Sequence, residues 1–147
     1  MKTIAPRELA AIFERSPRLA GRVRGTDAAS ILASARTEIA RMSESERIGV
    51  LNAHPRIGAD PASLSPVSRR EQSGDADVAT LQALAAMNEE YERTFGFRFV
   101  VFVAGRSKAE IVPVMRERLR RTRAEELATG IDEFLAIARD RLERIAP

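Results

Sequence analysis

His54 is the first residue in this sequence to consider for chemistry, because histidine is the side chain whose usual pKa lies closest to neutrality. It is the single histidine of the chain and lies in Leu-Asn-Ala-His-Pro-Arg-Ile-Gly, residues 51–58. If the protein moves protons near pH 7, His54 is the leading candidate for a general acid or base. The chain has no cysteine and no second histidine, which excludes thiol nucleophiles, His-pair relays and most zinc sites.

The residues after His54 predict that it lies just past the end of a helix. Pro55 disfavours the α conformation of the residue before it, and Gly58 then permits a turn. Exposed carbonyl groups at a helix C-terminus favour a cation, so we expect the imidazolium form there. Two interpretations stay open, a proton-transfer group and a capping histidine with only a structural role.

A second polar group follows the pair Ser65–Pro66, which is typical of an N-cap and the first position of a helix. Ser68, Glu71 and Gln72 have the spacing i, i+3 and i+4, which places a hydroxyl, a carboxylate and an amide on one helix face. Such a face can bind an amide-rich ligand, and the carboxylate can orient an imidazole. The alternative is a solvated surface turn.

Two more polar residues fall on apolar helix faces. Asn88 lies on the apolar stripe of a helix over 76–94, where we expect it to be buried and to brace the following loop. Arg141 lies about 20° from Phe134 around the last helix and points inward, whereas Arg139 lies at the edge of that face. Arg141 then has either a carboxylate partner within the protein or a substrate carboxylate.

Helical signals dominate the chain, and one stretch is strand-like. The residues at 97–104 are β-branched and aromatic and end at Gly105, but no second strand candidate exists to form a sheet. We therefore expect an all-α fold, a single-domain multi-helix bundle over 1–147 with one short extended segment near 97–104. Capping boxes are predicted at Ser43–Glu46, Ser107–Glu110 and Thr122–Glu125. The expected helices span 6–14, 17–23, 27–41, 44–53, 66–72, 76–94, 108–121 and 124–145.

The composition is that of a globular protein, with 44% hydrophobic and 31% charged residues and a net charge of +3. Much of the positive charge comes from Arg116–Arg123, which is either a solvated helix face or a surface for an acidic partner or nucleic acid. The latter defines the alternative function, a helical interaction module. The sequence has no membrane-spanning apolar run and no signal-peptide core, and the lack of cysteine fits a cytoplasmic location.

Taken together, the motifs resemble those of the 2-oxo-4-hydroxy-4-carboxy-5-ureidoimidazoline (OHCU) decarboxylases, enzymes of urate breakdown. They keep the order of that family and cover nearly the whole chain. The matching strings are Ser16–Pro17, His54-Pro55-Arg56-Ile57-Gly58, Ser68-x-x-Glu71-Gln72, Asn88-x-x-Tyr91, Phe95-Gly96-Phe97, the extended Phe99–Val103 and Ile137-Ala-Arg-Asp-Arg141-Leu142.

The resemblance implies a cofactor-free, metal-free and dimeric all-helical enzyme that yields (S)-allantoin from a small-molecule ureidoimidazoline, without nucleic-acid or membrane partners. It places the family's catalytic histidine on His54 and its assisting carboxylate on Glu71. The substrate-contacting residues it implies are Pro55, Ser68, Gln72, Arg141 and the backbone of Phe99, Val100, Val101, Phe102 and Val103.

This sequence departs from the family pattern at three places. Arg98 stands where many members have proline, and Arg56–Ile57 replaces the commoner Asp-Leu pair. The stretch between His54 and Ser68 is also short. Arg139 competes with Arg141 in the alignment, and the helical-face argument prefers Arg141.

Overall fold

The chain folds almost entirely into α-helices. The computed structural model describes the chain except at residues 1–3, 5, 14–15, 61–63, 73–75 and 146–147. The helices are α1 (Pro6–Ile12), α2 (Pro17–Arg22), α3 (Ala28–Arg41), α4 (Glu44–Asn52), α5 (Pro66–Glu71), α6 (Val78–Phe95), α7 (Lys108–Arg118) and α8 (Arg123–Ile145). No strand occurs in the described part of the chain, which confirms the all-α prediction. Residue 14, the predicted end of the first helix, lies outside the described residues.

The predicted capping boxes are present at the starts of α4, α7 and α8. In each, a hydroxyl accepts from a backbone N–H three residues on, and the carboxylate of that residue accepts in return. The pairs are Ser43 with Glu46, Ser107 with Glu110 and Thr122 with Glu125. α3 begins with a further box that the sequence reading missed, in which the Ser30 hydroxyl replaces the carboxylate opposite Asp27.

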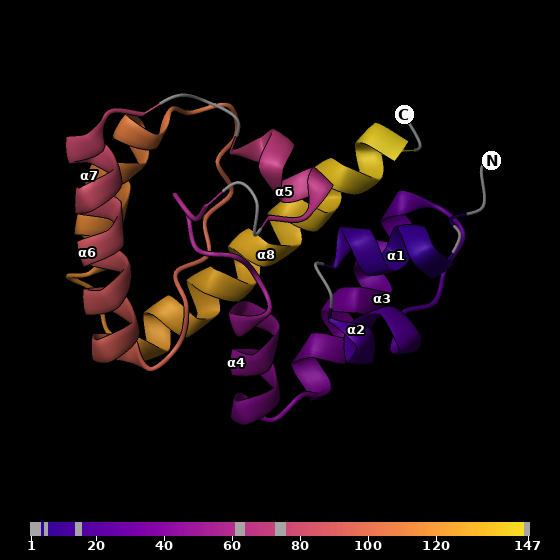
Figure 1. The fold of residues 1–147 in the computed structure, drawn as a ribbon. Helices are drawn as coiled ribbons and strands as arrows, with labels where there is room; N and C mark the ends of the chain where they lie inside the picture. The colour runs from indigo at the N-terminus through magenta and orange to yellow at the C-terminus, as the bar shows by residue number, and fades with distance from the viewer. Residues whose placement is uncertain (1–3, 5, 14–15, 61–63, 73–75, 146–147) are drawn as a thin grey trace.

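The last helix, α8, crosses the whole molecule and packs against α1, α3, α4 and α6 (Figure 1). Gly130 of α8 lies where α4 crosses it, and a Cβ atom there would lie 2.9 Å from Leu51 Cδ1. The missing side chain thus allows α4 to approach α8 closely. As a result, α4 delivers the residues that follow it to the middle of the molecule. The buried residues of α8 are Glu126, Leu127, Gly130, Phe134, Leu135, Ile137, Ala138, Arg141 and Leu142.

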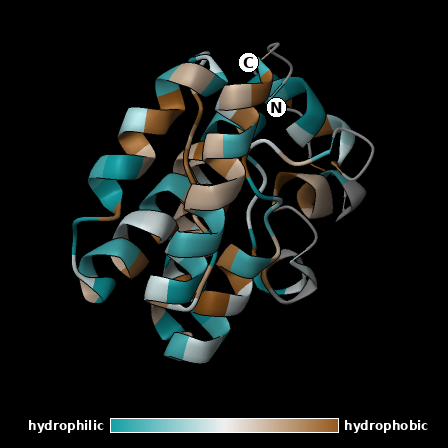
Figure 2. Ribbon diagram, turned by 60° about the vertical axis from the view of Figure 1, so that its left-hand side comes forward, coloured by the Kyte–Doolittle hydropathy of each residue, from teal (hydrophilic) through white to brown (hydrophobic). Residues whose placement is uncertain are grey.

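Hydrophobic residues gather on the helix faces that meet in one core (Figure 2). The largest fully buried side chains come from both halves of the chain, so the core joins the N-terminal helices to α6, α7 and α8. They are Tyr91, Phe13, Phe97, Phe99, Phe134, Ile12, Leu19, Ile31, Leu51, Leu84, Ile111 and Met115. Among the described helices, none combines the length and the apolar character that a membrane crossing needs.

Of the segment predicted as extended, residues 97–104, residues 98–103 form neither helix nor strand, and Ala104 belongs to the following turn with φ 52°. It has no neighbouring strand in the described structure. Side chains take the place of a strand partner. Arg118 Nη1 donates to the Val100 carbonyl at 2.6 Å, and the Arg118 guanidinium lies 4.4 Å from the centre of the Phe99 ring. Arg118 is itself held by Glu126, whose Oε1 is 2.7 Å from Arg118 Nε. This buried pair supports the extended segment from behind.

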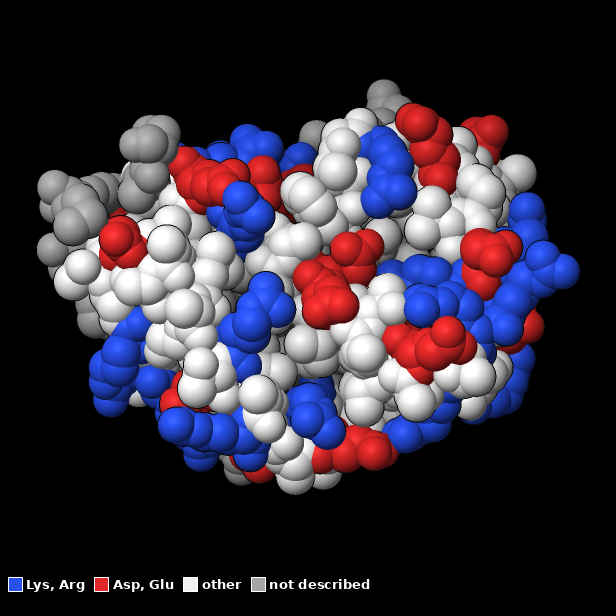
Figure 3. Space-filling model, turned by 180° about the vertical axis from the view of Figure 1, so that it is seen from behind, with Lys and Arg blue, Asp and Glu red and all other residues white. Residues whose placement is uncertain are grey.

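The basic run Arg116–Arg123 does not form one helix face. α7 ends at Arg118, three residues before its predicted end, and the run continues through a turn into α8. Arg118 is buried, Arg121 pairs with Glu126, and Arg123 donates to the Phe95 carbonyl. Basic and acidic side chains are intermixed on the face that Figure 3 shows. The alternative function, which needs a contiguous basic surface, is therefore not favoured.

Candidate active site

The loop after α4 carries His54 and turns back at Gly58, as the sequence predicts. α4 ends at Asn52, and the His54 N–H donates to the Leu51 carbonyl at 3.1 Å. Gly58 has φ 79°, and a Cβ there would lie 3.2 Å from Leu84 Cδ1, so both backbone shape and space favour glycine. The loop, residues 53–58, is thereby fixed against α6.

His54 is buried and neutral, which corrects the expectation of an imidazolium. Only 6% of the residue is exposed, and its ring packs edge-on against Phe134 with ring centres 5.2 Å apart. Burial, together with the nearby positive charge of Arg141, lowers the His54 pKa from its usual 6.5 to about 3. Arg98 already places a cation at the end of α4, where it donates to the carbonyl of Asn52, the last residue of the helix, and to that of His54.

The Nε2 atom of His54 is buried and has no hydrogen-bond partner in the described structure. A buried polar atom without a partner is unusual and calls for an explanation in function or in bound solvent. His54 is also one of the residues that line a cavity of about 770 Å³. A neutral imidazole at such a place can accept a proton at one nitrogen and donate one from the other.

α5 places its polar residues as the spacing predicts. Ser65 caps the helix by accepting from the Ser68 N–H, and Pro66 takes the first helical position. Ser68 is buried, while Glu71 and Gln72 are partly exposed. The Gln72 side-chain oxygen accepts from the Gly58 N–H at 2.9 Å, which joins α5 to the loop that carries His54.

Arg141 points inward, as its helical phase predicts, and its partners belong to the protein. It is 3% exposed at the side chain, whereas the side chain of Arg139 is 70% exposed and pairs with Glu143. Of the two alternatives left open by the sequence, the ion pair with a carboxylate is present. All five guanidinium N–H groups can be accounted for: two go to Glu71, two to the carbonyls of residues 11 and 12, and one to the Ser68 hydroxyl.

Asn88 is buried, as predicted, but it braces a different loop. Its Nδ2 donates to the Ile57 carbonyl at 3.0 Å, so it holds the loop with His54 rather than the loop that follows α6. The sequence could not show this, because the two residues lie 31 positions apart.

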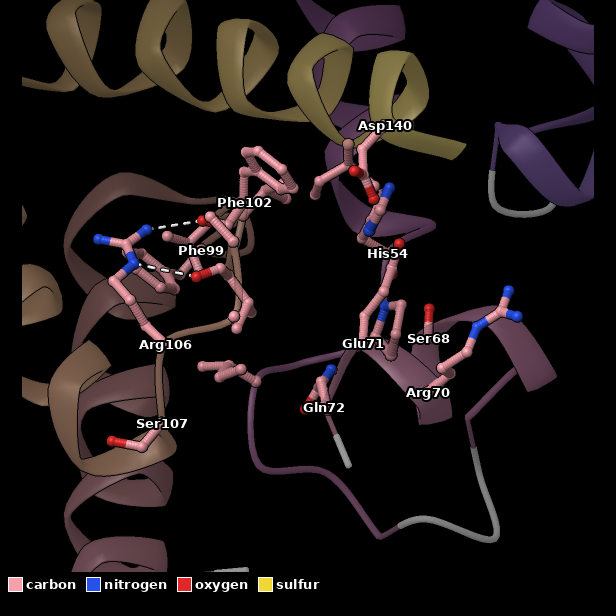
Figure 4. A pocket seen from close by; sticks show the side chains of 18 of the residues that line it. His54, Ser68, Arg70, Glu71, Gln72, Phe99, Phe102, Arg106, Ser107 and Asp140 are labelled. Atoms are coloured by element: carbon pink, nitrogen blue, oxygen red, sulfur yellow. Dashed lines mark hydrogen bonds between the residues drawn. The ribbon is translucent and has the colours of Figure 1, made fainter. Parts of the chain in front are cut away.

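A cavity of about 770 Å³ brings these elements together. Figure 4 shows His54 and the labelled residues of α5 on one side, with Phe99 and Phe102 across from them and Asp140 of α8 above. Of the predicted site residues, the cavity is lined by His54, Pro55, Ser68, Glu71, Gln72, Phe99, Val100, Val101, Phe102 and Val103. Arg141 lies behind Glu71 and lines a smaller neighbouring cavity instead.

The cavity also has polar lining residues that the sequence reading missed. Asp140 and Arg144 are an ion pair on α8, with Nε and Oδ2 3.0 Å apart, and their spacing from Ile137 on the same face was an available signal. Arg106 follows a turn in which Ala104 has φ 52°. The others missed are Arg70, Ser107 and Glu110. In the part of the chain that the structure describes, no group of three or more His, Asp or Glu side chains is placed to hold a metal ion.

Arginines occupy three carbonyl groups of the stretch that lines this wall of the cavity. Arg106 donates to the carbonyls of Phe102 and Val103 at 2.6 and 3.0 Å, and Arg118 takes that of Val100. In the described structure, no arginine takes the carbonyls of Phe99 and Val101.

The fold and the site together define a class of protein: an all-α protein with a cavity lined by one neutral histidine. The OHCU decarboxylase family model matches residues 2–143, and the chain belongs to that family. It is 29% identical over 140 residues to the 2-oxo-4-hydroxy-4-carboxy-5-ureidoimidazoline decarboxylase of Haloferax volcanii, covering 89% of this chain and 82% of that protein.

Two further similarities bear on the fold and on the extent of the chain. It is 29% identical over 107 residues to the uric acid degradation bifunctional protein of Bacillus sp. (strain TB-90), and the match spans 70% of this chain but 21% of that protein. A crystal structure of an OHCU decarboxylase in the presence of (S)-allantoin superposes with a TM-score of 0.77 at 22% identity, covering 94% of this chain and 96% of that one. This second similarity establishes the fold.

Proposed function

We propose that this protein decarboxylates 2-oxo-4-hydroxy-4-carboxy-5-ureidoimidazoline to (S)-allantoin in urate breakdown. The observation that carries the proposal is the cavity of about 770 Å³, in which His54 and the polar residues of α5 face the extended segment. Membership of the OHCU decarboxylase family supports the same substrate. The volume suits a small polar molecule, and the lining offers both hydrogen-bond donors and acceptors to an amide-rich ring.

In the chemistry that we propose, the substrate ring itself accepts the electron pair. The protein has to position the groups that transfer protons. When the bond to the carboxyl group breaks, carbon dioxide leaves and the electron pair passes into the conjugated imidazoline ring, where a solvent proton neutralises the accepting nitrogen. The hydroxyl then loses its proton as its oxygen becomes a ring carbonyl, and the neighbouring ring carbon gains one. Because the ring accepts the electron pair, we propose that the reaction is free of metal and cofactor.

His54 is the proposed general acid and base in this scheme. As a neutral imidazole it can take the hydroxyl proton and return a proton to the ring carbon. Since His54 lies on one wall of the cavity, the ring receives that proton on one face only, which sets the handedness of the product. Glu71, aligned by Arg141, is the proposed assisting carboxylate, and it can polarise His54 or hold a ring N–H once the substrate fills the cavity.

The remaining lining residues are proposed to bind the substrate. Ser68 and Gln72, with Pro55 beside His54, form one wall, and the backbone of Phe99–Val103 forms the other. This backbone offers N–H donors and, at Phe99 and Val101, carbonyls that no arginine takes in the described structure, which suits a ureido group. Arg141 is proposed to act on the substrate's oxygen-rich edge mainly through Glu71, because its own donors are occupied in this structure.

We further propose that residues 1–147 form a single domain that acts as a cytoplasmic homodimer. The family model spans nearly the whole chain, and the lack of cysteine suits a reducing compartment. Light scattering coupled to size-exclusion chromatography measures the mass in solution, and a monomer at assay concentrations would contradict the dimer.

The reaction itself is tested by generating the unstable substrate in place. Urate, urate oxidase and hydroxyisourate hydrolase are mixed with and without the purified protein, and circular dichroism follows the formation of (S)-allantoin. We expect formation in proportion to the amount of protein, well above the spontaneous rate. If the optical signal develops at the same rate with and without the protein, the proposed activity is wrong.

A further inference from the structure

We infer that Arg98 is a positioning residue that, together with Asn52, holds the two walls of the cavity in register. This inference rests on the proposed function, because it concerns how the proposed general acid and base is aligned. Arg98 lies outside the cavity that contains His54, and it is not a catalytic residue. Its side chain acts on the site indirectly, because it holds the backbone of the loop at 53–58 from the side away from the cavity.

Arg98 forms three hydrogen bonds with a separate part of the chain, two with Asn52 and one with His54. Arg98 Nη1 donates to the Asn52 carbonyl at 2.9 Å and to the His54 carbonyl at 2.8 Å. In return, the Asn52 side-chain oxygen accepts from the Arg98 backbone N–H at 3.0 Å. The residues lie 44 and 46 positions apart, so these bonds are purely tertiary.

The position of Arg98 in the chain explains why these bonds matter to the site. Its peptide group leads directly into Phe99–Val103, which line one wall, while its side chain holds the carbonyl of His54 on the opposite wall. One residue thus sets the distance between the proposed proton-transfer group and the proposed substrate-binding backbone. Displacements of about 1 Å in such a distance can lower a rate by about 100-fold.

The contact also satisfies backbone groups that would otherwise be open. The last carbonyls of a helix have no partner within it, and a cation near them is favourable. Arg98 is half-buried and lines a second cavity of about 590 Å³, where its side chain covers the carbonyls of Asn52 and His54. Without it, we expect the loop to move outward and His54 to become hydrated.

Hydration of His54 would be visible in its titration. The charged groups around the ring come from several elements: Arg141 and Asp140 from α8, Glu71 from α5 and Arg98 from the extended segment. Burial is the main cause of the low His54 pKa. Loosening the loop should therefore raise that pKa toward 6.5, even where all these charges are kept.

The test compares R98M, R98K and N52A with a matched control, R24M. Arg24 Nη1 donates to the carbonyls of Gly21 and Val23 at 3.0 and 3.2 Å, so this exposed arginine also makes a double contact with carbonyls at a helix end, but within its own stretch of chain. It does not line the cavity. R24M therefore measures the general cost of losing an arginine at a helix end, whereas N52A removes one of the three bonds and keeps the charge of Arg98.

In the allantoin-forming assay we expect R98M to lower kcat by about 10- to 100-fold while KM changes by less than about threefold. R98K should lose less than R98M, because an ammonium can still donate to at least one of the carbonyls. N52A should lower kcat by a smaller factor and R24M not at all. A kcat for R98M equal to that of R24M would overturn the inference.

The single histidine allows a second readout that needs no activity. The ¹³C-edited NMR signal of the His54 ring should show no titration near pH 6 in the wild type and R24M. In R98M, and to a smaller extent in N52A, it should titrate at least about one pH unit higher than in the wild type. A shift in R98M without any in R98K or N52A would mean that the charge alone acts, and would also overturn the inference.

These two readouts separate the failure of this inference from the failure of the proposed function. If the wild type forms no allantoin above the spontaneous rate, the proposed function is wrong, and the NMR comparison still decides the role of Arg98. If R98M does not fold, N52A gives the answer, because Asn52 is exposed and the substitution leaves the core intact. Unchanged kcat and unchanged titration in N52A and R98K would then count against the inference.

Discussion

The Glu71 carboxylate and the Arg141 guanidinium form a two-point ion pair, with Oε1 2.7 Å from Nη2 and Oε2 3.0 Å from Nε. The pair joins α5, a helix of six residues, to the long α8. A helix this short has little stability of its own, so tertiary contacts must hold it. The ion pair fixes the direction of the carboxylate along the cavity wall, and the Glu71 residue depends on Arg141 for that alignment.

Replacing His54 by asparagine tests the proposed proton transfer. Asparagine keeps a polar side chain at the site but cannot exchange a proton near neutral pH. We expect kcat to fall by about 100- to 10,000-fold in the allantoin-forming assay, with little change in the circular dichroism spectrum of the fold. Turnover close to that of the wild type would show that His54 is a structural residue.

Glu71→Gln tests whether the carboxylate acts on the reaction or only on binding. The substitution keeps the shape but leaves the buried Arg141 without its counter-charge. We expect a large fall in kcat with a smaller rise in KM, because the carboxylate is proposed to act through His54, which takes part in the reaction. We also expect a loss of about 1–3 kcal/mol in the free energy of unfolding. A rise in KM alone would make Glu71 a binding residue.

Arg141→Lys is compared with Arg139→Lys on the same helix. An ammonium cannot reproduce the planar set of donors that Arg141 directs at Glu71, Ser68 and two backbone carbonyls. We expect R141K to lower both kcat/KM and the melting temperature, and R139K, at an exposed side chain, to do neither. Kinetics and thermal melts with and without allantoin give the comparison. If R139K lowers kcat/KM or the melting temperature and R141K changes neither, the assignment of the inward position to Arg141 is contradicted.

Features encoded over short distances in the sequence were predicted well. The capping boxes depend on two residues three positions apart, and the inward direction of Arg141 depends only on the period of one helix. The extended segment was also predicted, because β-branched and aromatic residues ended at a glycine. Each of these patterns carries its own cause within a few residues.

Features that depend on partners far along the chain could not be predicted. Glu71 and Arg141 are 70 positions apart, so the sequence left the partner of Arg141 open. The charge state of His54 was predicted wrongly, as an imidazolium, for the same reason. The helix-end carbonyls near it are taken by Arg98, and the ring is buried against Phe134, and neither fact is visible in local spacing.

The burial of His54 predicts a specific dependence of stability on pH. Its pKa is about 3 in the folded protein and about 6.5 when exposed in the unfolded chain, so the unfolded state binds the proton more tightly. The stabilisation is therefore complete above pH 6.5 and is lost as the pH falls from 6.5 toward 3. Within that window the free energy of unfolding should fall by about 1.4 kcal/mol per pH unit from this residue.

Urea denaturation of the wild type and of H54N between pH 7 and pH 4.5 isolates this contribution. Carboxylates with lowered pKa values, such as Glu92 beside Arg56, also weaken the fold at low pH, but they do so equally in both proteins. We expect the wild type to lose stability more steeply than H54N below pH 6.5. Parallel curves would mean that folded His54 takes up a proton readily, and that the imidazole is not held neutral by its burial.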